Sequence, residues 1–143
     1  MKTQTITLAE VEYIAHQTAR EMMEYDEPIP SFGSRFPNVL ESCLAVPFQR
    51  FNQRDLYKGF LAKASVLFYL MIKNHPFQNG NKRIAMTTLF VFLIKNKKWL
   101  KVDNQSLYNF AAWVAQSPAD LQKDVITGIE RFLKKYLVPL RAQ

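Results

Sequence analysis

The chain has 143 residues, 48% of them hydrophobic and 22% charged, a balance typical of a single globular domain. The one cysteine, Cys43, excludes an internal disulfide and a cysteine-based zinc site. The 19 basic and 12 acidic side chains leave a formal charge of +7, which favours a polyanionic partner such as a nucleotide, a nucleic acid or an acidic protein.

The first predicted element is an amphipathic helix from Thr7 to about Tyr25. Thr7 and Glu10 form a capping-box pattern, and apolar residues then recur at helical spacing. Three prolines and a glycine follow within residues 28–37, so a loop or a short hairpin is expected there. Asn38 is expected to cap a short helix over residues 39–46, which Pro47 ends.

Two strongly apolar helices, residues 56–72 and 82–94, are predicted in the middle of the chain. The first has no broad polar face, which places it centrally in the fold. The polar residues 77–81 form the turn between the two helices.

Two further helices are predicted in the last third of the chain. Asp103 caps one that extends through Val114, and Ser117 with Pro118 begins the last, which runs to about Tyr136. No segment alternates with the period of a strand, and no composition shift marks a domain boundary. The sequence therefore predicts one all-α domain, residues 1–143, built as a compact bundle of about six helices.

No segment has the composition of a membrane span or a secretory signal. The longest apolar runs, residues 64–72 and 86–94, are far shorter than the roughly 20 residues that cross a bilayer. The amino terminus lacks the apolar run of a signal peptide. We therefore expect a cytoplasmic protein without a membrane partner.

The segment from His75 to Arg83 carries the strongest chemical signal in the chain. It places Lys82 and Arg83 at the amino terminus of an apolar helix, where backbone N–H groups and the helix dipole favour an anion. Gly80 permits the positive φ of a nest of N–H groups, and the Arg83 guanidinium can bind two phosphate oxygens at once. Each cation opposes the dipole by up to about 1 kcal/mol, so the pair indicates a bound anion.

His75 stands at the other end of the same turn. Imidazole is well suited to accept a hydroxyl proton near neutral pH, so a histidine beside an anion site suggests group transfer. The alternative is purely structural. His75 would then only end one helix, and Lys82 and Arg83 would be solvated charges at the start of the next.

The run His-Pro-Phe-Gln-Asn-Gly-Asn-Lys-Arg between two apolar helices closely resembles the signature loop of the Fic/Doc family, above all of its death-on-curing (Doc-like) branch. Residues 40–42, 47–51, 55–57 and 73–74 also resemble that branch, so the resemblance extends to most of the chain. It implies a compact helical domain that transfers part of a nucleoside triphosphate, such as ATP, to a hydroxyl of a target protein.

The resemblance also implies a role for each residue of the loop. His75 would be the catalytic base that deprotonates the acceptor hydroxyl. Phe77 would pack the loop into the core, Gly80 with Asn81 would form the anion nest, and Lys82 with Arg83 would hold phosphates. The residues implied to bind the nucleotide are thus Phe77, Gly80, Asn81, Lys82 and Arg83. Residues 28–37 fall where the family places a flap that docks the target in extended form.

Two features of the loop depart from family patterns. The family usually has Asp or Glu, the magnesium ligand, where this chain has Asn79, whose amide oxygen is a weaker, neutral ligand. Mg²⁺ would then be held mainly by the nucleotide, or activity would be reduced or lost. Members that transfer AMP have Gly in place of Lys82 and Arg in place of Met86. The loop therefore favours transfer of the γ-phosphate, and AMP transfer is the alternative.

The partners implied by the resemblance are those of a toxin–antitoxin system. The target would be a translation factor such as elongation factor Tu. Fic proteins that silence themselves carry Ser or Thr four residues before an inhibitory Glu, and no glutamate here has that neighbour. Inhibition is therefore expected from a separate antitoxin, and the basic surface would suit an acidic one.

Other candidate residues have simpler explanations. His16 has no second histidine or cysteine at ligand spacing, and Cys43 is expected in the core. The basic runs 95–101 and 134–136 are expected to be solvated helix ends. The competing class is a basic helical module that contacts nucleic acid through residues 95–101 and 134–141. Nucleic acid is disfavoured as a partner because no reader motif is recognisable.

Overall fold

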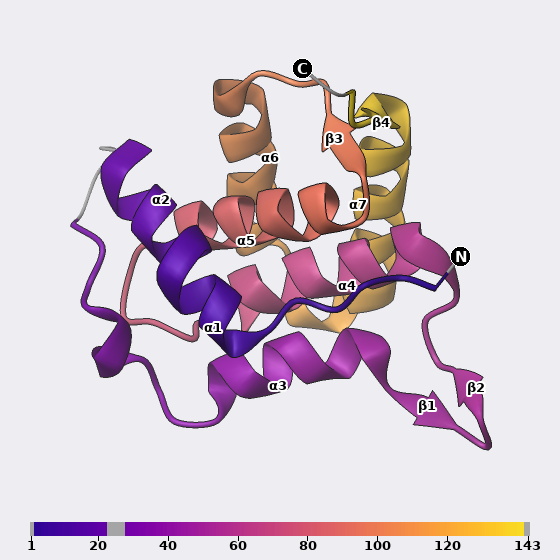
Figure 1. Cartoon of the computed structure of the whole chain (residues 1–143), viewed down its shortest axis with the longest axis horizontal. Helices are drawn as coiled ribbons and strands as arrows, with labels where there is room; N and C mark the ends of the chain where they lie inside the picture. The colour runs from indigo at the N-terminus through magenta and orange to yellow at the C-terminus, as the bar shows by residue number, and fades with distance from the viewer. Residues whose placement is uncertain (1, 23–27, 142–143) are drawn as a thin grey trace.

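The computed structural model describes residues 2–22 and 28–141 (Figure 1). Its helical elements are α1 (Leu8–Glu10), η1 (Val11–Ala15), α2 (His16–Met22), η2 (Phe32–Ser34), α3 (Val39–Ala45), η3 (Val46–Phe48), α4 (Gly59–Lys73), α5 (Asn81–Lys95), α6 (Asn104–Gln116), η4 (Ala119–Leu121) and α7 (Gln122–Tyr136). The strands are β1 (Arg50–Phe51), β2 (Arg54–Asp55), β3 (Lys98–Leu100) and β4 (Leu137–Pro139). The predicted all-α class is confirmed: with α1, η1 and α2 taken as one continuous helix, the described residues form six α-helical segments.

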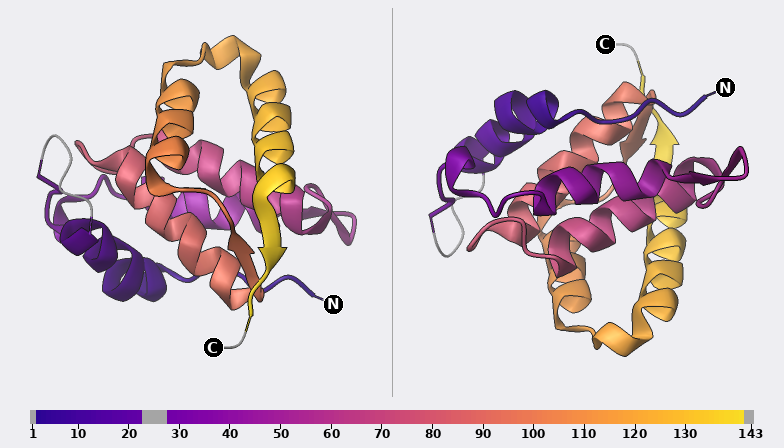
Figure 2. Two further views of the ribbon diagram at one scale, coloured as in Figure 1. Left: turned by 90° about the horizontal axis from the view of Figure 1, so that it is seen from above. Right: turned by 90° about the horizontal axis from the view of Figure 1, so that it is seen from below.

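Helices α4 and α5 form the centre of the fold. They pack against each other, while η1 and α2 lie along α5 and α3 lies along α4. Helices α6 and α7 cover the pair from the other side, as Figure 2 shows. Every residue from Lys63 to Ile72 is buried, so α4 occupies the central position predicted from its lack of a polar face.

The first helix begins at the predicted cap. Thr7 Oγ1 accepts a hydrogen bond from the Glu10 N–H at 3.1 Å, and Glu10 Oε1 accepts one from the Thr7 N–H at 2.8 Å. The helix widens into a π-helical turn over η1 and continues as α2. Its predicted end near Tyr25 lies outside the described residues.

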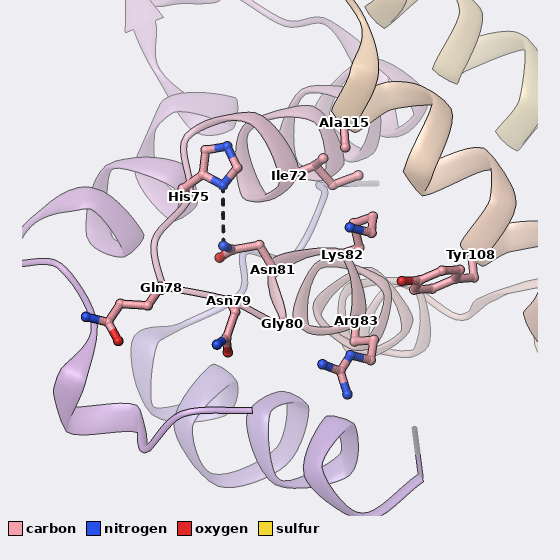
Figure 3. Close-up of a pocket in the computed structure, with 10 residues that line it drawn as sticks. All are labelled: Ile72, His75, Gln78, Asn79, Gly80, Asn81, Lys82, Arg83, Tyr108 and Ala115. Atoms are coloured by element: carbon pink, nitrogen blue, oxygen red, sulfur yellow. Dashed lines mark hydrogen bonds between the residues drawn. The ribbon is translucent and has the colours of Figure 1, made fainter. Parts of the chain in front are cut away.

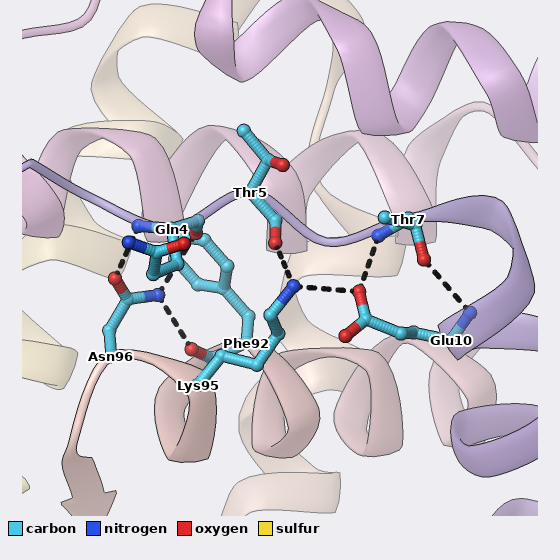
Figure 4. A network of polar contacts seen from close by, with 7 residues as sticks. All are labelled: Gln4, Thr5, Thr7, Glu10, Phe92, Lys95 and Asn96. Atoms are coloured by element: carbon cyan, nitrogen blue, oxygen red, sulfur yellow. Dashed lines mark hydrogen bonds and ion pairs between the residues drawn. The ribbon is translucent and has the colours of Figure 1, made fainter.

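Polar contacts fasten the amino-terminal segment to the end of α5 (Figure 4). Lys95 Nζ donates to the Thr5 carbonyl at 2.6 Å and pairs with Glu10 Oε1 at 2.8 Å. The Asn96 side chain exchanges hydrogen bonds with the Gln4 backbone. Burial raises the pKa of the Glu10 carboxyl, but the hydrogen bonds from Lys95 and Thr7 outweigh burial and leave that pKa below its ordinary value.

Several predicted boundaries before α4 are wrong. Asn38 has a left-handed φ of 69° and makes no side-chain cap, because an N-cap side chain needs extended backbone. The α-helix before Pro47 ends at Ala45, one residue earlier than predicted, and a separate 3₁₀ turn that contains Pro47 follows through Phe48. Helix α4 begins at Gly59 rather than near residue 56, because β1 and β2 pair in a tight hairpin just before it.

The segments on either side of α6 and α7 also differ from expectation. Ser117 Oγ donates to the Val114 carbonyl and thus closes α6, whereas Pro118 stands at the start of η4. The basic run 95–101 is not merely a solvated helix end. Its residues Lys98–Leu100 pair antiparallel with β4, and this brings the two basic runs of the sequence together. Three-residue strands are too short to leave a period-two pattern in a sequence.

Candidate functional site

The loop between α4 and α5 lines a cavity of about 470 Å³ (Figure 3). Six of the seven predicted site residues line it, and the seventh, Phe77, is fully buried beneath the loop. Helix α6 contributes Tyr108 and Ala115 to the opposite wall. The lining residues are Ile72, His75, Gln78, Asn79, Gly80, Asn81, Lys82, Arg83, Tyr108 and Ala115.

His75 is the residue that turns the chain away from α4. Its φ of 49° lies in the left-handed region, which favours glycine and which histidine occupies more often than most side chains. Such a conformation costs on the order of 1 kcal/mol or more and persists only where the surroundings impose it. The imidazole is exposed, so it is accessible to a second molecule at the mouth of the cavity.

Asn81 fastens the loop with its side chain. Its Oδ1 accepts from the Phe77 N–H at 3.0 Å, and its Nδ2 donates to the Phe77 carbonyl at 2.8 Å. These two bonds fix the orientation of the amide, which leaves Nδ2 facing His75 Nδ1 at 3.5 Å. At that length the contact orients the ring without fixing which nitrogen carries the proton. The sequence did not indicate this positioning role.

Gly80 has the positive φ that the sequence argument required. It stands at the N-cap of α5 with φ 74° and ψ 8°. A Cβ added there would lie 3.0 Å from Ile29 Cγ1, so the segment over residues 28–37 packs directly on the loop. Only glycine satisfies both the backbone angle and the close approach.

The first turn of α5 is basic and contains no acidic residue. Arg83 is only 4% exposed and lies in the wall of the cavity, while Lys82 is half-buried with its ammonium 5.9 Å from the centre of the Tyr108 ring. Arginine remains charged when buried, so the cavity has a fixed positive charge beside the N–H groups of the helix terminus. This arrangement favours a phosphate group.

Asn79 is the residue that the sequence analysis placed at the position of the metal ligand. Its Oδ1 is buried and has no hydrogen-bond partner among the residues that the structure describes, which costs about 1–3 kcal/mol unless a bound group satisfies it. Within residues 2–22 and 28–141, no group of three or more histidine, cysteine or acidic side chains is placed to hold a metal ion. A single neutral amide oxygen is a weaker ligand for Mg²⁺ than a carboxylate.

The segment over residues 28–37 is irregular, with one 3₁₀ turn and no hairpin, and it lies against the signature loop. The Phe36 N–H donates to the Pro76 carbonyl at 2.9 Å. Buried His16 bonds through Nε2 to the Pro30 carbonyl at 2.8 Å, and its ring lies 5.5 Å from those of both Phe32 and Phe77. His16 therefore joins α2, this segment and the loop.

Burial also accounts for the ionisation of the two other candidate residues. Burial lowers the pKa of His16 below its ordinary value and outweighs the opposing bond to Pro30. Cys43 lies in the core, as predicted, with its thiol directed at the Leu70 carbonyl. Burial raises the pKa of the Cys43 thiol to about 12, which removes it as a nucleophile near neutral pH.

Lys73 holds α6 against the end of α4. Its ammonium donates to the carbonyls of Ala115 and Ser117, at 3.3 and 2.5 Å. These bonds cross more than forty positions of sequence and hold Ala115, which lines the cavity, close to the end of α4. Sequence reasoning missed Tyr108 and Ala115 because nothing near them marks a site.

The comparison with known protein families matches residues 5–93, more than half of the chain, to the Fic/DOC family. The chain belongs to the Fic/DOC family. Fic/DOC proteins are in general transferases that use a nucleoside triphosphate to modify proteins. The matched region contains the whole loop from His75 to Arg83 and ends before α6. No curated protein and no solved structure matches the chain.

Within residues 2–22 and 28–141, no helix combines the length and the apolar composition needed to cross a bilayer.

Proposed function

We propose that this Fic/DOC protein is a Doc-like kinase that transfers the γ-phosphate of ATP to a hydroxyl of a target protein. The observation that supports it most directly is the juxtaposition of an exposed histidine with a basic helix terminus in one cavity. The exposed His75 serves as the base, and the buried guanidinium of Arg83 with the N–H groups of α5 serves as the anion site.

The triphosphate binds across the first turn of α5. Its oxygens accept hydrogen bonds from the backbone N–H groups that Gly80 presents at the start of the helix. Arg83 contacts two oxygens through its planar guanidinium, and Lys82 adds a mobile positive charge. Mg²⁺ enters with the nucleotide as part of the substrate, and Asn79 Oδ1 offers it one neutral ligand.

In the transfer step, His75 accepts the proton of the target hydroxyl as its oxygen bonds to the γ-phosphorus. The bond between the γ-phosphorus and the β–γ bridging oxygen breaks, and ADP leaves with that electron pair. The proton on the imidazole is then released to solvent. Positioning and charge stabilisation provide most of the rate, so the fixed loop matters as much as the base.

Phosphate transfer is preferred to AMP transfer on the residues around Arg83. Family members that transfer AMP have glycine at the position of Lys82. In this chain Lys82 lines the cavity. Those members have a second arginine at the position of Met86. Met86 is fully buried in the core and does not line the cavity. The described lining of the cavity therefore contains no second arginine to present the α-phosphate.

The target hydroxyl is proposed to reach His75 along residues 28–37. This segment contacts the loop through Phe36 and Ile29, so a peptide laid along it would run past the cavity. A translation factor such as elongation factor Tu as target and a separate acidic antitoxin as inhibitor remain proposals that rest on the resemblance and on the charge of +7.

The experiment uses purified chain, candidate target and magnesium with ATP labelled at either the γ- or the α-position. Label transferred from the γ-position alone, with a matching mass gain of one phosphate, supports the kinase. Label from the α-position would instead establish AMP transfer. The His75→Asn variant is the matched control, because asparagine tolerates the same left-handed backbone and lacks the base.

A further inference from the structure

Tyr108 lines the candidate site but lies outside the region matched to the family. It stands on α6 and lines the same cavity as the signature loop. Its ring faces the Lys82 ammonium at 5.9 Å from the ring centre. An aromatic ring thus adjoins the phosphate-binding residues on the wall that the family motif does not supply.

The position of Tyr108 in the cavity is set firmly. Neighbouring residues Leu107, Ala111 and Val114 bury one face of α6 in the core. Asp103 caps the start of the helix by accepting from the Ser106 N–H at 3.1 Å, and Lys73 holds its end. Because both ends of α6 are anchored, the backbone of Tyr108 is held beside the cavity before any ligand binds.

Tyr108 and His75 lie on opposite sides of the cavity, with Lys82 between them (Figure 3). Helix α5 begins with the basic turn between these two sides. If the phosphates of a nucleotide lie over this turn, one end of the nucleotide lies near His75 and the other near Tyr108. These ends are the terminal phosphate and the nucleoside.

We infer that Tyr108 binds the nucleoside end of the nucleotide by stacking on its base. An aromatic side chain stacks on any nucleobase, whereas the phosphates are already served by Lys82, Arg83 and the helix terminus. With the base at α6, the terminal phosphate lies toward His75. This inference rests on the proposed function, and it makes α6 the element that sets the direction of the nucleotide.

The alternative role for Tyr108 is to position the Lys82 ammonium through the cation–π contact. The two roles differ in what they require of the ligand. A stacking residue matters only for a ligand with a base, whereas a residue that positions Lys82 matters equally for a bare polyphosphate. Inorganic tripolyphosphate has the phosphates and lacks the nucleoside, so its binding distinguishes the two roles of Tyr108.

The test measures the Kd of ATP and of tripolyphosphate, each with magnesium, by calorimetry on the full chain. Tyr108→Ala is expected to weaken ATP binding roughly 5- to 150-fold, the range found when base-stacking aromatics are truncated, and to change tripolyphosphate binding by less than about twofold. Tyr108→Phe keeps the ring and should bind ATP within about threefold of the unsubstituted chain. Tyr13→Ala is the matched control, because Tyr13 is 72% exposed and does not line the cavity.

A second measurement does not depend on how well the alanine variant folds. The unsubstituted chain is irradiated with 8-azido-ATP, whose reactive group is on the base, and the labelled peptide is identified by mass spectrometry. Label within α6, residues 104–116, supports the inference, and competition by excess ATP should remove it. Label confined to other elements overturns it.

The titrations with ATP and tripolyphosphate also decide whether Tyr108 stacks on the base. Unchanged ATP affinity in Tyr108→Ala, or equal losses for ATP and tripolyphosphate, overturns the stacking role. If the unsubstituted chain binds neither ligand, the nucleotide site itself is wrong, and the proposed function is overturned together with this inference. If it binds both and only the stacking result is negative, the proposed function stands without Tyr108.

Discussion

The side-chain amide of Asn81 forms two hydrogen bonds with the backbone of Phe77, accepting from its N–H and donating to its carbonyl. Phe77 is fully buried, so these bonds join the core to the loop that carries His75 and the basic turn. The pair closes the signature loop into a fixed shape. Asn81 therefore acts on the site as a positioning residue.

Replacing Asn81 by alanine should weaken both the fold and the site. It leaves the buried N–H and carbonyl of Phe77 without partners, so the free energy of unfolding should fall by about 1–3 kcal/mol. Urea denaturation measures this change. Asn109→Ala is the control, because Asn109 is exposed and its side chain accepts a hydrogen bond from exposed Gln105, and its effect should stay within about 0.5 kcal/mol. Equal effects of the two substitutions would contradict the role of Asn81.

Gly80→Ala should destabilise the protein for two separable reasons. The positive φ of 74° strains any side chain, by about 1 kcal/mol or more, and the new Cβ would meet Ile29 Cγ1 at 3.0 Å. Adding Ile29→Ala should relieve the steric part only, so the double variant should be more stable than additivity predicts. Gly33→Ala is the control, because a Cβ there meets nothing within 4 Å. If the effects of Gly80→Ala and Ile29→Ala on the free energy of unfolding were strictly additive, the contact between the two positions would be contradicted.

His75→Asn should abolish transfer to the target and leave the fold intact. Asparagine accepts the left-handed backbone, whose φ is 49°, but cannot take a proton near neutral pH. His75→Gly should likewise be inactive, and the free energy of unfolding should rise by up to about 1 kcal/mol because glycine relieves the strain. Retention of full transfer in either variant would remove His75 as the base.

Asn79→Asp should strengthen the use of magnesium. A carboxylate is a better ligand for Mg²⁺ than an amide oxygen, and in the part of the chain that the structure describes the buried Oδ1 of Asn79 has no partner that the change would disrupt. We expect faster transfer and half-maximal rate at a lower magnesium concentration. Gln78→Glu, one position earlier and exposed, is the matched control. A similar gain from that control would point to charge in general rather than to the position of Asn79.

The protein should lose stability as the pH falls through the ordinary pKa of histidine. Burial keeps the pKa of His16 below its ordinary value of 6.5, although Pro30 and Glu12 oppose this and Arg20 adds to it. Below pH 6.5 the unfolded chain therefore takes up a proton that the folded protein resists. The stabilising contribution is complete above that pH and declines below it, by at most about 1.4 kcal/mol per pH unit.

Denaturation between pH 7.5 and 5.5 measures this slope. His16→Gln keeps a donor for the Pro30 carbonyl and has no proton to gain, so its free energy of unfolding should depend less on pH over that range. An unchanged slope in His16→Gln would assign the pH dependence to other groups.

The local parts of the structure could be predicted from the sequence. The Thr7 and Glu10 cap, the Asp103 cap and the buried centre of α4 all follow from spacing within one or two helical turns. The loop from His75 to Arg83 could be identified because its chemistry is contiguous in the chain. Short strands and the left-handed Asn38 escaped prediction because their conformations depend on distant partners or on backbone strain.

The far wall of the site was decided by tertiary packing alone. Tyr108 reaches the cavity because α6 packs on α4 and α5 and is anchored there by Lys73. Ile29 lies over Gly80 because His16 and Phe36 hold residues 28–37 against the loop. Sequence periodicity records which face of a helix is buried, but it does not record which other helix covers that face. The sequence therefore determined the signature loop, and only the packing of the helices determined which residues surround it.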